Sequence, residues 1–351
     1  MKMSAVFQGI LTALIVCTAG AAGQDGQAGD TAGSARSLHS PGNPSAVTDT
    51  GRTLRDDRAP SPEFVPAEEF TWAGTPRVTM DGSRPNLTTK IRPLPAAIAA
   101  GTYFGSLTWL HIYQEKTIWA AGASFHVVDD WDESLSANYG GHFTGGYFLS
   151  YVSAEMLLTS GFSLTAANLF GSVMGFAYQW YVEVLDGYGR DYGWSPGEVT
   201  FQSAGAVYYL CSCYSPFLQN FTPKADYYPA PWFGDRKKYL AKTPIDDYSA
   251  WTFWMSANVH NLLPASGKRY WPEWLNLAFG YSARDLGYPD RYRVIVVALD
   301  FNLAKILPEG GSVWNWWRQT LCFLKIPGPA LEFQVNRETR LYLFYPFKIT
   351  F

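Results

Sequence analysis

The chain has 351 residues and a formal net charge of −3, with 16% charged and 17% aromatic residues. This length is sufficient for one or two domains with a hydrophobic core. The near-neutral charge and the lack of a basic block exclude nucleic acid as an expected partner. The many aromatic residues are typical either of an aromatic-rich core or of the boundary between membrane and water.

The first 62 residues predict two segments outside the folded region. Residues 1–23 read as an export signal, with Lys2 at the start, an apolar run at 5–16 and small residues at the cleavage point. The stretch ending at Cys17 resembles a lipoprotein cleavage box, but the bulky residue before it favours ordinary cleavage over lipidation. Residues 24–62 are rich in Gly, Ser, Ala and Pro without any aromatic residue, which predicts a disordered linker.

The cysteines predict neither a disulfide framework nor a metal site. Besides Cys17 there are Cys211, Cys213 and Cys322, and an odd number cannot complete a set of bridges. Cys211 and Cys213 stand two apart in an apolar run, so they point to different sides of a helix. From the sequence we expect no cofactor and no bound metal.

Residues 63–225 predict a region built mainly of helices. The run 94–114 has no acidic residue and no Lys or Arg, and three further runs follow at 143–158, 164–185 and 195–214. Short turns make neighbouring helices antiparallel. The last three helices are each about 30 Å long, which matches a bilayer core. They also carry many Ser, Thr, Tyr and Gln residues, so we predict a membrane-associated bundle that lies against a bilayer or partly within it.

Two local patterns refine this picture of the helical region. Ala167, Gly171 and Gly175 form a stripe of small residues at intervals of four, which permits the close approach of another helix. Residues 125–132 carry three Asp residues and one His, but they lack the spacing of a calcium loop. We therefore predict a solvated acidic loop that caps the next helix.

Four polar residues mark the ends of the three central helices. His142 opens the first, Glu183 and Asp186 close the second, and Glu198 opens the third, where Ser195 and Glu198 form a capping box. Antiparallel packing should bring these four residues to one end of the bundle. They are the candidate catalytic cluster, but we favour a structural role, in which a buried polar network fixes the register of the helices.

Residues 226–351 predict an antiparallel sheet of about five strands with one helix, packed on the bundle, so the expected fold is α+β. In the last strand the odd-numbered residues from Leu341 to Phe351 are apolar or aromatic, and we expect this face to point inward. Pro346 predicts an edge strand or a bulge. The strand patterns cover residues 251–259, 274–283, 292–303, 330–335 and 341–351, the helix covers 313–323, and residues 222–247 connect the two regions.

Six short motifs between about residue 99 and the C-terminus occur at 140–143 (Gly-Gly-His-Phe), 147–150, 183–187, 193–195, 254–258 and 274–281. In this order they resemble the YfiM-like family of predicted periplasmic lipoproteins, a domain of unknown function. The chain departs from the family pattern at Asn138 and Tyr139, where Asp and Lys are usual, and at Glu198 and Gln202, where Asp and Asn are usual. A more distant similarity is to the membrane-embedded VanZ-like proteins. Neither resemblance implies a known reaction.

Three hypotheses for function follow, and we favour the first. It is an exported protein of the bacterial cell envelope, on the periplasmic side of the outer membrane. It would have a structural or interaction role, with envelope lipids or another envelope protein as partners. The second is a lipid- or envelope-modifying enzyme of the hydrolase type, in which His142 is the general base and Glu183 and Asp186 orient it or bind a metal. The third is a module that binds a lipid or glycan head group, with Tyr188, Asp191 and Trp194 at its rim.

Overall fold

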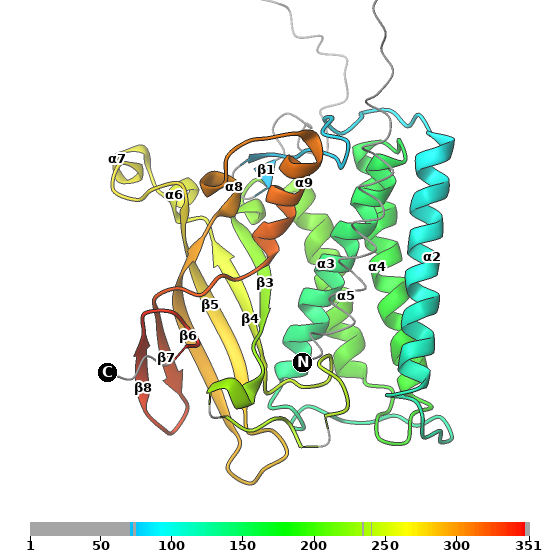
Figure 1. Cartoon of the computed structure of the whole chain (residues 1–351), viewed down its shortest axis with the longest axis vertical. Coiled ribbons are helices and arrows are strands. Elements are labelled where there is room, and N and C mark those ends of the chain that lie inside the picture. Colours follow the sequence, from blue (N-terminus) through cyan, green and yellow to red (C-terminus); the bar gives the residue numbers. More distant parts are fainter. Residues whose placement is uncertain (1–70, 73–74, 234, 240, 348–351) are drawn as a thin grey trace, which may run out of the picture.

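The structure is a computed structural model that describes residues 71–72, 75–233, 235–239 and 241–347. The predicted export signal at 1–23, with Cys17, and the predicted linker at 24–62 lie outside the described residues. The fold is α+β, with a bundle of long helices beside an antiparallel sheet (Figure 1). Among the described residues, none of the helices combines the length and the apolar character that crossing a membrane requires.

Four long helices make up the bundle. They are α2 (Pro93–Glu115), α3 (Ala137–Thr159), α4 (Leu164–Asp186) and α5 (Pro196–Tyr214). α3 packs against both α4 and α5, which also contact each other, and it faces the sheet. α2 contacts α3 and lies on the outer side of α4, where the Tyr103 hydroxyl donates to the carbonyl of Met174 at 3.3 Å (Figure 1). All four helices were predicted.

The small residues of α4 set its distance from α3, as predicted. A Cβ atom added to Gly171 would lie 2.6 Å from the backbone nitrogen of Ala154, and one added to Gly175 would lie 2.6 Å from that of Ser150. The backbones of the two helices are therefore almost in contact, which only glycine permits.

Two helix starts differ in how well the sequence predicted them. α5 begins with Pro196 in its first turn and with the Ser195 hydroxyl accepting a hydrogen bond from the Glu198 backbone N–H, as expected, but the Glu198 carboxylate contacts Asn138 and His142 in place of the Ser195 backbone N–H that the predicted capping box requires. α3 begins at Ala137, five residues before His142, so His142 lies in its second turn and does not open it. Asn138 belongs to the first turn, where its side chain donates to Asp130, and this contact extends the helix toward its N-terminus.

The sheet has six antiparallel strands among the described residues, each paired with its neighbours in sequence. We expected about five, because Phe221–Tyr227 was assigned to the helical region and the connecting segment. This first strand alternates apolar and polar residues but contains Pro223, and it buries its polar side: Lys224 is buried, and its ammonium lies 2.7 Å from Asp300. The strands are β3 (Phe221–Tyr227), β4 (Trp251–Ala257), β5 (Leu275–Arg284), β6 (Tyr292–Phe301), β7 (Ala330–Gln334) and β8 (Thr339–Tyr342).

Shorter elements close the space between the sheet and the bundle. The predicted aromatic helix is present as α9 followed by a 3₁₀ turn, and its Trp316 is completely buried against the helices. The remaining elements are β1 (Thr71–Trp72), β2 (Thr75–Pro76), η1 (Leu218–Asn220), η2 (Ala230–Phe233), α6 (Val259–Leu262), α7 (Ala265–Lys268), α8 (Leu303–Ile306), α9 (Ser312–Thr320) and η3 (Leu321–Phe323).

The predicted orientation of the last strand is wrong. Leu341 is 73% exposed, whereas Tyr342 is buried and points to the other side of the sheet. The register explains the difference, because Tyr342 pairs with the buried Ala330 and Leu341 pairs with the exposed Leu331. β8 is an edge strand, as predicted, but it ends at Tyr342, and residues 348–351 lie outside the described part of the chain.

Candidate functional site

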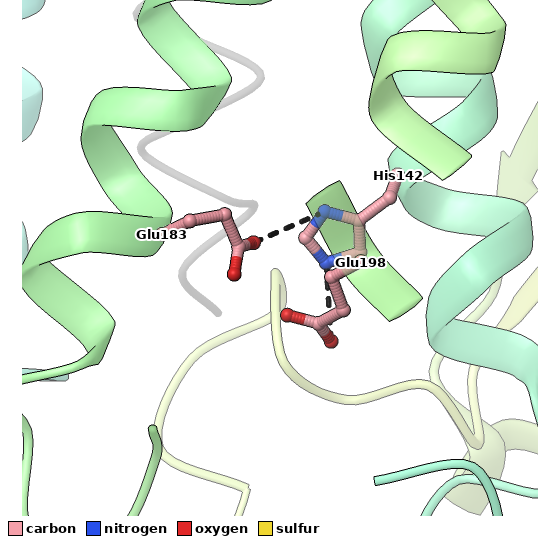
Figure 2. A group of neighbouring side chains, drawn as sticks. All are labelled: His142, Glu183 and Glu198. Carbon is pink, nitrogen blue, oxygen red and sulfur yellow. Dashed lines mark ion pairs between the residues drawn. The ribbon is translucent and has the colours of Figure 1, made fainter. Parts of the chain in front are cut away.

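Three helices place His142, Glu183 and Glu198 together at one end of the bundle, as predicted (Figure 2). The imidazole of His142 comes from α3 and lies between two carboxylates. Its Nδ1 atom is 3.4 Å from Oε1 of Glu183 on α4, and its Nε2 atom is 3.2 Å from Oε1 of Glu198 on α5. The Glu183 side chain is completely buried, while His142 and Glu198 keep a small exposed fraction.

Asp186 lies at the same end but does not contact the imidazole within the distance of an ion pair. Its carboxylate accepts a hydrogen bond from the indole N–H of Trp119 at 2.5 Å. Trp119 belongs to the segment that follows α2, so Asp186 fastens this segment to the end of α4. Of the four predicted residues, three therefore form the cluster and Asp186 acts on it through its charge.

A second group of side chains holds Glu198 in place. The amide of Asn138 donates to Glu198 at 2.9 Å and to Asp130 at 2.6 Å. Asp130 also accepts from the hydroxyls of Tyr139 at 2.8 Å and Ser195 at 2.6 Å. The loop at 125–132 was predicted to be solvated, but Asp130 is buried, because it bridges the starts of α3 and α5.

The electrostatics of the cluster follow from burying several acids around one base. Burial opposes the cationic form of His142, but the charge and hydrogen bond of Glu198 and the charge of Glu183 outweigh it and raise the pKa of the imidazole. Burial and repulsion by Glu198 raise the pKa of Glu183, whereas His142 and Asn138 overcome the burial of Glu198 and lower its pKa. These directions favour an ion pair between His142 and Glu198 and disfavour a second negative charge on Glu183.

This protonation state bears on the predicted role of His142 as a general base. A general base must be neutral to accept a proton, and the neighbouring carboxylates favour the protonated imidazole. The pKa of Asp186 is also raised, to about 7, because the burial of its carboxyl outweighs the hydrogen bond from Trp119. The carboxylates around His142 therefore favour a positively charged group at this position.

The residues predicted at the rim of a head-group site each have contacts outside the His142 cluster. Asp191 forms an exposed ion pair with Lys242 at 2.7 Å, and Tyr188 packs edge-on against Phe125. Trp194 is held through its backbone, which exchanges hydrogen bonds with the 125–132 loop. Sequence reasoning missed Tyr248, a partly buried residue whose pKa is raised by burial and by the charges of Glu198 and Glu183. It stands between the predicted connecting segment at 222–247 and the aromatic strand that begins at Trp251, so its sequence context does not single it out.

Comparisons of the chain with family models, with curated proteins and with solved structures find no match. The resemblance to the YfiM-like family stays a prediction.

Proposed function

We propose that the chain is a protein of the cell envelope that attaches to a membrane through the outer faces of α2, α4 and α5, with a structural or interaction role. The observation that carries the proposal is the lack of charge on these helices. No Asp, Glu, Lys or Arg occurs within residues 93–114, 164–182 or 199–214. A helical run of 22 residues without one charged side chain, as at 93–114, is unusual for a protein face in contact with water.

The exposed side chains of these helices are large and apolar. Phe104 on α2 is 64% exposed and Phe170 on α4 is 50% exposed. A lipid surface is the occupant that fits, because it offers no charged group to pair with and tolerates exposed hydroxyls of Ser, Thr and Tyr near its boundary. The other exposed residues of this apolar face are Leu94, Trp109, Ile112, Leu169, Val173, Trp180, Tyr181 and Val207.

The aromatic members of this face indicate how deep the cluster would lie. Trp180 and Tyr181 precede Glu183 on α4, and the Tyr181 hydroxyl is 2.8 Å from Nδ1 of His111 near the end of α2. Trp and Tyr prefer the boundary between hydrocarbon and water. Membrane attachment through this face would therefore place the His142 cluster close to the lipid head groups.

Vesicle flotation tests the proposal directly. The full chain carrying Cys17→Ser, which cannot be lipidated, should float with vesicles of phosphatidylethanolamine and phosphatidylglycerol. Phe104→Glu combined with Phe170→Glu should lower the partition coefficient at least about tenfold, because each buried Phe contributes about 1.5–3 kcal/mol and 1.4 kcal/mol is a factor of ten.

The matched control places the same charges on exposed residues of the sheet half, with Tyr270→Glu and Leu341→Glu. This variant should float like the parent protein. A parent protein that stays at the bottom of the gradient, or a helix variant that floats unchanged, would contradict the proposal. Loss of flotation in the control alone would move the attachment to the sheet.

A further inference from the structure

The His142 cluster has an excess of acid that its own residues do not balance. Glu183, Glu198, Asp186 and Asp130 lie at this end of the bundle, and His142 is the one basic side chain of the described residues within ion-pair distance of any of them. No Lys or Arg nitrogen of the described residues lies within ion-pair distance of these four carboxylates. The two other completely buried carboxylates of the described residues, Glu155 and Asp300, each form an ion pair with a cation, Arg77 and Lys224. The cluster is therefore the part of the interior that attracts a further cation.

Several polar atoms of the cluster also have unused bonding capacity. Glu183 is completely buried, and neither of its carboxylate oxygens accepts a hydrogen bond from an N–H or hydroxyl group of the described residues. Nδ1 of His142 and Oδ1 of Asn138 are also buried and form no hydrogen bond with the described residues. Gln202, one turn after Glu198 on α5, is buried with its amide unpaired. Buried polar atoms nearly always have a partner, so this concentration at one place points to a ligand.

We propose that His142, Glu183 and Glu198 bind one divalent transition-metal ion of the first row, such as Zn²⁺. One imidazole nitrogen and one oxygen of each carboxylate lie within 4.8 Å of one another. Ligand atoms around a zinc ion stand about 3–4 Å apart, because each bond is about 2.0–2.2 Å long. A modest movement of the side chains, with loss of the protons they share, brings the three atoms to that spacing.

The set of donor atoms selects the kind of ion. Ca²⁺ and Mg²⁺ prefer oxygen ligands throughout, whereas an imidazole nitrogen with two carboxylates suits Zn²⁺, Mn²⁺ or Fe²⁺. Three protein ligands leave at least one coordination position open. Asn138, which bonds both Glu198 and Asp130, is in the position of an outer residue that orients a ligand. The proposal is independent of membrane attachment, because the site is formed inside the bundle.

Metal titration of the full, untagged chain tests the site. After treatment with a chelator, the protein should bind one Zn²⁺ per chain in isothermal titration calorimetry, and Co²⁺ should give the visible absorption of a low-coordinate site. Glu183→Gln keeps the size of the side chain and removes its charge, and it should weaken Zn²⁺ binding at least about 100-fold, beyond the 10–100-fold typical of outer residues.

His260→Ala is the matched control, because His260 and Glu273 form a second His–Glu pair, 3.8 Å apart, at the surface. This control should bind Zn²⁺ like the parent. Where Glu183→Gln fails to fold, as judged by circular dichroism, His142→Gln replaces it. The electron spin resonance spectrum of the parent with bound Cu²⁺ should show coupling to an imidazole nitrogen. Loss of this coupling in His142→Gln supports the site. Lack of saturable binding by the folded parent overturns the proposal, as does equal Zn²⁺ affinity in the parent and a folded cluster variant.

Discussion

Replacing Arg77 with Met should cost about 3–5 kcal/mol of the free energy of unfolding, the range for a buried ion pair that loses one partner. Arg77 and Glu155 are both completely buried, with 2.7 Å between the guanidinium and the carboxylate. The guanidinium also donates to Asn168 at 3.0 Å and to the Tyr209 hydroxyl at 3.1 Å, and Glu155 accepts from the indole of Trp316 at 3.0 Å. In the variant, the Glu155 charge would stay buried without its cation.

The loss should depend on pH in a defined direction. Burial raises the pKa of Glu155 from its ordinary value of 4.5, and Arg77 opposes this shift, so removing Arg77 raises the pKa further. A carboxyl whose pKa is higher in the folded than in the unfolded state takes up a proton on folding. The free energy of unfolding of Arg77→Met is therefore closest to that of the parent at low pH. It falls as the pH rises through the raised pKa of Glu155. Urea unfolding should show a smaller deficit at pH 5 than at pH 8.

Two controls separate this effect from a loss of packing. Adding Glu155→Gln to Arg77→Met removes the stranded charge and should abolish the pH dependence of the deficit. Arg92→Met breaks the partly exposed pair with Asp81 and should cost less than about 1 kcal/mol. A deficit below that size for Arg77→Met at pH 8, or one that grows toward pH 5, would contradict the assignment.

The second large effect is expected at Gly205, where α5 crosses α3. A Cβ atom added there would lie 2.0 Å from the carbonyl oxygen of Phe143, a backbone atom that cannot move without its helix. Forcing such a contact costs about 1–3 kcal/mol or more, and the gain of up to about 1 kcal/mol from replacing Gly by Ala in a helix does not offset it. Gly205→Ala should therefore unfold at a lower urea concentration than the parent.

The matched control is Gly101→Ala on α2, where an added Cβ atom meets nothing within 4 Å. This variant should be as stable as the parent, or more stable by up to about 1 kcal/mol. Equal stabilities of the two variants would mean that α3 and α5 are not as close as described. Because Phe143 adjoins His142, and Gly205 follows Glu198 by two turns of α5, the same substitution should also weaken binding at the cluster.

The sequence by itself determined the long helices and the end of the bundle at which the cluster lies. Ser163 and Ser195 cap α4 and α5 with their own side chains, and residues 164–182 and 199–214 of these helices carry no charged side chain. Signals of this kind act within one helix turn, and short turns then dictate antiparallel neighbours. The prediction that His142, Glu183 and Glu198 meet needed no more than this.

Tertiary structure decided the features whose partners are distant in sequence. Glu155 stands alone in its helix until Arg77, 78 residues earlier, pairs with it. Lys224 of β3 can be buried because Asp300 of β6 pairs with it. Leu341 points outward because the register with β7 places Tyr342 inside. A buried charge or an inward face is stable only when the partner is in place. The sequence pattern around one residue cannot contain that partner, so the fold had to supply it.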